Sequence, residues 1–427
     1  MTAAKPRLAM FSRHSLLDGR GMGYVMPPGT DQGHPFLGAW PHNIGDQFVA
    51  SGLARALDMD EFITLTRGAT PEQFDYVNNE CDAIIVVAQN ALFPGWFETH
   101  LPVSYLRQIR IPMIFFSLGL QFRFGDEIYL TPGDVESLKH IQDHCASLQV
   151  RGHMTEELLH RYGIRNTRVI GCPSLLYSGS PSIKVRAPSF DRVTFTITDM
   201  GRLPDIHGWQ FAVIDSLIEK SNQITIATQG GEFVLQEYLA LRDGVSFYER
   251  TDFDVTLAGG EPQDYPRTNW TGGLTEGGLV RSVLERKDLG KARDSARWYY
   301  RDAPEGVRDA IVEHGFYSPL MSEYIRRARD QSLYVGTRLH GNLMGLVQGT
   351  PSVFAIHDYR LKDMAEFLEV PSISIESGET HVSLEELDWS AFARKWIYVW
   401  NGFVDFFEEN GLATTIQRVN DKGALLV

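Results

Sequence analysis

The sequence predicts an α/β protein made of two domains of similar size that face each other. Short apolar runs alternate with helix-like segments along most of the chain, which is typical of βαβ units and a mainly parallel sheet. The 427 residues exceed what one hydrophobic core usually supports. A stretch rich in Ser, Pro and Gly, residues 178–191, interrupts the alternation, and the pattern then restarts. We therefore expect two domains joined by this linker.

In the first half, short apolar runs predict buried strands, and apolar residues at helical spacing predict helices. We expect strands at residues 7–11, 62–66, 83–88, 111–120 and 147–152, and helices from about Asp46, at 135–145 and at 155–164. A Gly/Pro-rich stretch, residues 18–41, separates the first strand from the first helix. Residues 167–176 close this half.

The second half repeats the pattern. We expect strands at residues 192–198, 223–228, 332–336 and 352–356, and helices at 211–221, 232–243, 319–330 and 341–348. Residues 252–292 have weak periodicity and many Gly residues, which favours an irregular insertion. Trp, Tyr and Phe are dense between Leu384 and Phe407 and predict helices packed on the core. The predicted divisions are residues 1–180, 190–380 and a helical tail at 381–427.

Composition excludes several classes of protein. A formal net charge of -14 leaves no basic footprint for nucleic acid. The three cysteines form no C-x-x-C unit, so neither a structural zinc site nor a disulfide framework is expected. No apolar stretch approaches the roughly 18 to 20 residues of a membrane span, and the N-terminus lacks an apolar signal segment. We expect a cytoplasmic protein without a metal.

The clearest candidate site is the segment GTRLHGNLMGLVQGTP, residues 336–351, where a strand turns into a helix that Gly349 ends. Arg338 suits bidentate binding of a carboxylate or phosphate, and His340 can donate a proton near neutral pH. Gly341 permits close backbone approach, and the helix start adds free N–H groups. Because the two side chains would diverge within a regular helix, one must lie in the turn to share a ligand. The same pattern also fits a structural ion pair of Arg338 and a half-buried, hydrogen-bonded His340.

Other polar residues stand at predicted strand ends or helix starts. His357 and Asp358 end the next strand and could orient a substrate hydroxyl, although Asp358 also suits a helix N-cap. Asn43 and Gly45 could line a cleft, whereas Asp46 suits an N-cap. Arg151 could contact an anion or pair with Glu156. Cys172 fits either a nucleophile or a small buried thiol.

These residues carry a resemblance to the polysaccharide pyruvyl transferase family. The motifs are N-I-G-D at 43–46, the strand ending at Arg151, I-G-C-P-S at 170–174 and R-L-H-G within 336–360. The resemblance implies a GT-B-like fold of two Rossmann-like domains with a cleft between them. It implies transfer of a pyruvyl group from phosphoenolpyruvate, a co-substrate, to a sugar of a glycan, forming a ketal and releasing phosphate. No cofactor is implied.

The resemblance also suggests roles for residues. His340 and Arg338 would be catalytic, and they would bind the donor with Gly341, Arg151 and Arg202. The acceptor or cleft-lining set would be Asn43, Gly45, Asp46, Asn90, His357 and Asp358. There are two departures from the family pattern. Many relatives carry a Gly-Gly turn where this chain has Ala88, Gln89 and Asn90. Relatives often end the first strand of the second domain with an Arg, whereas this chain has Thr198 and Asp199 there and Arg202 slightly later. The alternatives are a GT-B-type nucleotide-sugar glycosyltransferase and a non-catalytic glycan-binding member.

Overall fold

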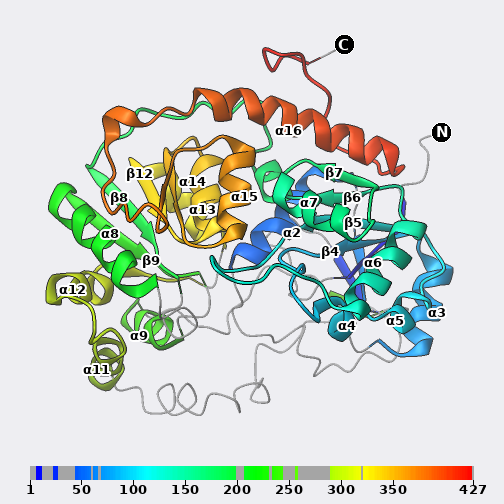
Figure 1. Cartoon of the computed structure of the whole chain (residues 1–427), viewed down its shortest axis with the longest axis horizontal. Coiled ribbons are helices and arrows are strands. Elements are labelled where there is room, and N and C mark those ends of the chain that lie inside the picture. The colour runs from blue at the N-terminus through cyan, green and yellow to red at the C-terminus, as the bar shows by residue number, and fades with distance from the viewer. Residues whose placement is uncertain are drawn as a thin grey trace.

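The computed structural model describes ten stretches of the chain. They are residues 6–11, 23–26, 44–58, 61–65, 69–198, 206–229, 233–243, 255–257, 289–318 and 321–425. The strands form two sheets, so the predicted α/β class with parallel sheets is confirmed. Figure 1 shows the two sheets side by side, each with helices packed on it.

The first sheet has eight strands within these residues, in the order β10-β2-β3-β1-β4-β5-β6-β7. They are β1 (Leu8–Phe11), β2 (Gly23–Met26), β3 (Glu61–Leu65), β4 (Ala83–Val87), β5 (Met113–Leu118), β6 (Leu148–Val150), β7 (Thr167–Val169) and β10 (Val255–Leu257). Its helices are α2 (Ile44–Ala56), α3 (Pro71–Glu80), α4 (Trp96–His100), α5 (Val103–Leu106), α6 (Pro132–His144), α7 (His153–Arg161) and the 3₁₀ turn η1 (Pro173–Ser178). Two strands differ from expectation: β2 lies within the Gly/Pro-rich stretch, and the edge strand β10 lies within the predicted insertion, most of which is outside the described residues.

The second sheet has six strands in the described residues, in the order β11-β9-β8-β12-β13-β14. They are β8 (Arg192–Thr196), β9 (Gln223–Ala227), β11 (Gly315–Phe316), β12 (Leu333–Gly336), β13 (Ser352–Ile356) and β14 (Ser372–Ser374). Its helices are α8 (His207–Lys220), α9 (Phe233–Asp243), α11 (Leu289–Tyr299), α12 (Glu305–Glu313), α13 (Met321–Asp330), α14 (Leu339–Leu346) and α15 (Tyr359–Leu368), followed by the 3₁₀ turn η3 (Leu384–Glu386) and α16 (Ser390–Glu409). Residues 179–191 connect the two sheets without a helix or strand.

Two helices of the first half begin with the same Thr-Pro signal. Thr70 and Thr131 accept hydrogen bonds from the third residue of α3 and α6, at 3.4 and 3.1 Å, and a Pro follows each Thr. This capping box satisfies backbone N–H groups that a helix start leaves unpaired. The Asp134 carboxylate of α6 also accepts from the backbone of Gly95 and Phe97, so it fixes α4 against α6.

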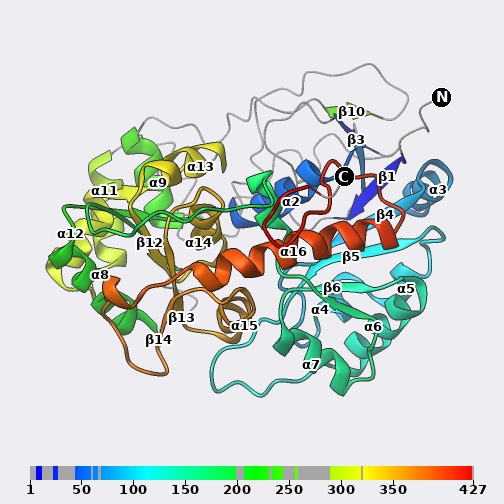
Figure 2. The ribbon, with the colours of Figure 1, turned by 90° about the horizontal axis from the view of Figure 1, so that it is seen from above.

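Helix α16 connects the two halves of the molecule, and it lies across both sheets in Figures 1 and 2. Near its start, the Trp389 indole N–H donates to the carbonyl oxygen of Ser352 in β13. Near its end, Phe406 packs edge-on against Phe116 of β5, with ring centroids 5.0 Å apart. One buried cluster therefore runs through Ile85 of β4, Phe195 of β8 and the aromatic face of α16. The aromatic tail is a single long helix packed on the core, and no helix in the described residues could cross a membrane.

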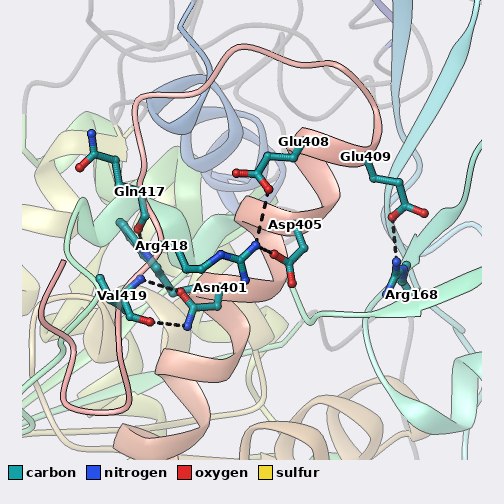
Figure 3. Close-up of polar contacts among 9 residues, drawn as sticks. Arg168, Asn401, Asp405, Glu408, Glu409, Gln417, Arg418 and Val419 are labelled. Atoms are coloured by element: carbon teal, nitrogen blue, oxygen red, sulfur yellow. Dashed lines mark hydrogen bonds and ion pairs between the residues drawn. The ribbon is translucent and has the colours of Figure 1, made fainter. Parts of the chain in front are cut away.

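Polar contacts hold the residues after α16 against that helix (Figure 3). Arg418 pairs with Asp405 and Glu408, and the Asn401 amide exchanges two hydrogen bonds, of 2.9 Å each, with the backbone of Val419. The Thr415 N–H then donates to the carbonyl oxygen of Ala56 at the end of α2. The chain thus returns to the first half after α16.

Candidate functional site

Arg338 and His340 stand where β12 turns into α14. Arg338 is the N-cap residue and has extended backbone angles, with φ −99° and ψ 115°, whereas His340 lies in the first helical turn. The Arg338 side chain is therefore outside the regular helix, as convergence of the two side chains requires. Its Nε donates to the carbonyl oxygen of Ile197, just beyond β8, at 3.2 Å.

The His340 ring lies between parts of the first half of the chain. It is 6% exposed, and its Nε2 is 3.6 Å from the sulfur of Cys172. A β-carbon placed on Gly45 would be 2.4 Å from its Nδ1. The start of α2 therefore packs directly on a ring that α14 supplies, and only Gly leaves room for it. A backbone hydrogen bond of 2.8 Å from Ile44 to Gln229 fixes the same junction.

Arg151 follows β6 and is fully buried at 1% exposure. Its Nε donates to the hydroxyl of Ser117 at 2.9 Å, and its Nη1 donates to the amide oxygen of Asn90. Its Nη2 is buried and has no hydrogen-bond partner among the described residues. The predicted pair with Glu156 is not formed, because Glu156 instead contacts His153 and Thr167. Burial lowers the pKa of Arg151. A buried guanidinium with an unused N–H group is suited to bind an anion.

Two residues beside Arg151 have left-handed backbone. Gln89 has φ 53° and Ser117 has φ 65°, a conformation that costs non-Gly residues on the order of 1 to 3 kcal/mol each. Gln89 accepts a hydrogen bond of 2.7 Å from the N–H of Gly119, and Ser117 accepts one from Arg151. The altered turn at 88–90 thus keeps a backbone that Gly would adopt easily, while Asn90 provides a partner for Arg151.

A second group of charges follows β13. Asp358 caps α15 by accepting from the N–H of Leu361 at 2.8 Å, as one interpretation of the sequence predicts. Its other oxygen is 3.2 Å from Nη2 of Arg360 and 3.5 Å from Nε2 of His357. Neither ring nitrogen of His357 has a hydrogen-bond partner in the described residues, and burial lowers its pKa. Asp358 also forms an isolated antiparallel bridge with Arg123, so this turn touches the first half of the chain.

These groups converge electrostatically on His340. Burial lowers the pKa of His340 well below its ordinary value of 6.5, and the charges of Arg151, Arg360 and Arg338 lower it further. The imidazole is therefore neutral at neutral pH. The three guanidinium groups come from the ends of β6, β12 and β13, in two different sheets.

The remaining predicted residues have the following positions. Asp46 lies in the first turn of α2 rather than at the N-cap, because the helix already includes Ile44, and its charge acts on Arg151. The close approach that Gly341 permits is to Thr196, whose Cγ2 would be 2.5 Å from an added β-carbon. Asn43 and Arg202 lie outside the described residues. Arg360 and Ser117 were not among the predicted site residues, and Cys172 was predicted to be either a nucleophile or a small buried thiol.

A hollow elsewhere on the second sheet is separate from this site. It is lined by residues that include Gln223 and His314, at the start of β9 and the end of α12. The site residues follow the opposite, carboxyl ends of the strands, where parallel α/β sheets bind ligands.

Comparisons with solved structures give weak matches. A UDP-GlcNAc 2-epimerase from Methanocaldococcus jannaschii is 11% identical, with 89% of this chain and 91% of that chain covered and a TM-score of 0.35. A putative UDP-N-acetylglucosamine 2-epimerase from Listeria monocytogenes is 10% identical, with 87% of each chain covered and a TM-score of 0.39. The Anabaena protein Alr3699/HepE, in complex with UDP and glucose, is 11% identical, with 95% of this chain and 98% of that chain covered and a TM-score of 0.39.

No curated protein sequence matches this chain. A sequence model described as "Polysaccharide pyruvyl transferase" matches residues 38–244, which include N-I-G-D, Arg151 and I-G-C-P-S but not R-L-H-G. Over residues 38–244 the chain is therefore similar to the polysaccharide pyruvyl transferase family.

Proposed function

We propose that the protein transfers the pyruvyl group of phosphoenolpyruvate to two hydroxyl groups of a sugar in a glycan or glycan precursor. The observation that carries this proposal is a set of buried contacts that joins Arg151 to His340 through Ser117 and Cys172, with Arg338 two residues before His340. Phosphoenolpyruvate joins a carboxylate and a phosphate in one small molecule, so it requires several cationic donors close together. Arg is the side chain best suited to hold both groups.

The reaction requires a proton at the methylene carbon of the donor. Protonation there makes C2 electrophilic, and a sugar hydroxyl oxygen forms a bond to C2. The bond between C2 and the phosphate oxygen then breaks, and a second hydroxyl completes the ketal. The two hydroxyl protons balance the new methyl hydrogen and the hydrogen on the released phosphate. His340 is our candidate for moving the proton to the donor, a role that typically contributes about 10² to 10⁴ in rate.

The charge of His340 then depends on the ligand. Without an anion, burial and three guanidinium groups lower its pKa, so it holds no extra proton. A bound carboxylate and phosphate offset the guanidinium charges and favour the imidazolium form. The proton-donating form would therefore develop where and when the donor is bound.

Arg151 and Arg360 would hold the donor with Arg338. Arg151 is fixed by Ser117 and Asn90 and keeps one buried N–H group unused. Arg360 is held by Asp358 at 3.2 Å, and its Nε is buried without a hydrogen-bond partner in the described residues. Pre-positioned donors of this kind stabilise developing charge without reorganising.

The test measures phosphate release from phosphoenolpyruvate across a panel of sugars, with the product checked for a new carboxylate. Arg338→Ala and His340→Gln should each lower turnover by about 10²-fold or more while the protein remains folded; Gln is used because Ala would leave a cavity at the buried His340. Arg326→Ala is the control, because Arg326 is exposed on α13 and pairs with Glu323. Loss of folding in both site variants would instead indicate a structural role.

Thermal shift separates this proposal from its alternatives. Stabilisation by phosphoenolpyruvate and none by nucleoside diphosphates supports the pyruvyl transferase. The opposite result would favour a nucleotide-sugar glycosyltransferase. Binding of phosphoenolpyruvate without phosphate release over a broad sugar panel would favour a non-catalytic member.

A further inference from the structure

Cys172 lies at the centre of a buried polar group beside His340. It precedes η1, and its side chain is 0% exposed. Its sulfur is 3.1 Å from the hydroxyl of Ser174, 3.7 Å from the hydroxyl of Ser117 and 3.6 Å from Nε2 of His340. The thiol thus connects the residue that orients Arg151 with the candidate proton carrier.

The hydrogen bonds of this group can be assigned consistently. The Ser174 hydroxyl donates to the sulfur. The Ser117 oxygen accepts from Nε of Arg151, so its own O–H is left to donate, and the Cys172 sulfur lies within reach. Because both hydroxyls donate to the sulfur, the S–H group of Cys172 can donate to Nε2 of His340. In a neutral imidazole, one ring nitrogen is an acceptor, and Nε2 can take this role.

The other ring nitrogen lies beside Gly45, whose added β-carbon would be 2.4 Å from Nδ1. The ring is therefore held between the backbone of α2 and the thiol of Cys172.

We propose that Cys172 is a positioning residue for His340: its S–H group donates to Nε2 and keeps the ring proton on Nδ1. The catalytic consequence rests on the proposed function, because it requires His340 to act in turnover. The positioning itself is a property of the ligand-free protein. A thiol suits this place because it is small, apolar enough for full burial and still a weak donor.

The direct test is ¹⁵N NMR of the histidine rings in the ligand-free protein, with His340 assigned by its loss in His340→Gln. In the wild type, Nε2 of His340 should report as the unprotonated, hydrogen-bonded nitrogen. In Cys172→Ala the proton should redistribute toward Nε2. In Cys172→Ser, which keeps a donor, the original tautomer should largely remain. The control is Cys81→Ala, which removes another buried thiol away from the site.

Turnover provides a second readout. Loss of one hydrogen bond predicts a fall in kcat of about 2- to 13-fold in Cys172→Ala, with KM for phosphoenolpyruvate within about twofold. Cys172→Ser should recover part of this loss, and Cys81→Ala should match the wild type. Melting temperatures of all variants identify any that fail to fold.

The two proposals can fail separately. An active pyruvyl transferase whose His340 tautomer and kcat are the same in Cys172→Ala would overturn the positioning role. A protein without pyruvyl transfer whose His340 tautomer still changes in Cys172→Ala would overturn the proposed function and support the positioning role.

Discussion

Gly45 of α2 packs against the imidazole of His340. A β-carbon added to Gly45 would lie 2.4 Å from Nδ1 of His340 and 2.8 Å from Cβ of His340. The contact joins a helix of the first sheet to a residue after a strand of the second. Since real β-carbons do not approach so closely, either the ring or α2 must move when Gly45 is replaced. The orientation of His340 and the junction of the two sheets therefore depend on the same residue.

Gly45→Ala should accordingly affect both stability and activity. Overpacking of a buried site typically costs about 1 to 3 kcal/mol, and displacement of His340 should lower kcat. Urea unfolding and phosphate release would measure the two effects. Gly208→Ala is the matched control, because an added β-carbon there has nothing within 4 Å, and a helical Gly→Ala change should be neutral or stabilising. Equal stabilities of the two variants would contradict the contact.

The low pKa of His340 predicts a pH dependence of stability. In the unfolded chain the imidazole takes up a proton below about pH 6.5, whereas in the folded chain it does so only at lower pH. The unfolded state therefore binds more protons in this window, and the free energy of unfolding falls as the pH falls below 6.5. His340→Gln should reduce this slope by up to about 1.4 kcal/mol per pH unit, measured by urea unfolding between pH 6.5 and 5. An unchanged slope would mean that the folded protein protonates His340 as easily as the unfolded chain.

Donor binding should be accompanied by proton uptake. Because the anion offsets the charges of Arg151, Arg338 and Arg360, it should raise the pKa of His340 from its lowered value. Titration calorimetry of phosphoenolpyruvate near pH 7, in two buffers of different ionisation enthalpy, should reveal up to about one proton taken up per ligand. His340→Gln should bind with less uptake. Identical observed enthalpies in both buffers for the wild type would rule out this coupling.

Much of the fold follows from local pattern. The buried strands β4, β5, β8 and β13 are short apolar runs, and their predicted positions agree with the structure to within a few residues. Strands β2 and β10 were not predicted. Strand β2 pairs with β3 and with the edge strand β10, and the long-range pairing of residues 255–257 with residues 24–26 leaves no local signal in the sequence.

Some residues of the candidate site could also be predicted from local sequence pattern, and others could not. Arg151 was recognisable because it ends a predicted strand, and Arg338 and His340 because they stand where a predicted strand turns into a helix, the place where α/β sheets bind ligands. Arg360 stands four residues beyond β13, as His340 stands four residues beyond β12, but only His357 and Asp358 were given a role at that turn. The contact of Cys172 with His340 joins residues 168 positions apart, and the left-handed backbone of Gln89 comes from tertiary packing. Neither has a signature in one sequence.

Gln89→Gly should relieve backbone strain without loss of activity. Gln89 has φ 53°, which Gly adopts freely, and the hydrogen bond from Gly119 uses only its backbone oxygen. Relief of the strain should stabilise the folded protein by about 1 kcal/mol. This gain should equal or exceed the loss of stability that Gly causes by raising the conformational entropy of the unfolded chain. The variant should be at least as stable as the wild type in urea. Ala91→Gly, a buried neighbour without positive φ, is the control and should be less stable; a similar loss in both variants would contradict the assignment of strain to Gln89.

The Asp363 carboxylate of α15 contacts the start of α7. It accepts from the backbone N–H groups of Met154 and Thr155, at 2.8 and 3.2 Å, and from the Thr155 hydroxyl at 2.6 Å. Because α7 begins two residues after Arg151, this contact ties the position of that guanidinium to the second sheet. Gly152 is required between them, since an added β-carbon would be 2.1 Å from the Asp363 carboxylate.

Asp363→Ala should leave buried N–H groups at the start of α7 unpaired, at a cost of about 1 to 3 kcal/mol measured by urea unfolding. It should also raise KM for phosphoenolpyruvate, because Arg151 would lose its fixed place relative to Arg338. Asp363→Asn keeps an acceptor oxygen, so it should lose less stability and raise KM for phosphoenolpyruvate by less. Asp405→Ala removes an exposed carboxylate paired with Arg418 and should cost no more than about 1 kcal/mol. If Asp363→Ala were no more harmful than Asp405→Ala, the helix start would be held by other contacts, and the link between the two sheets at Arg151 would be refuted.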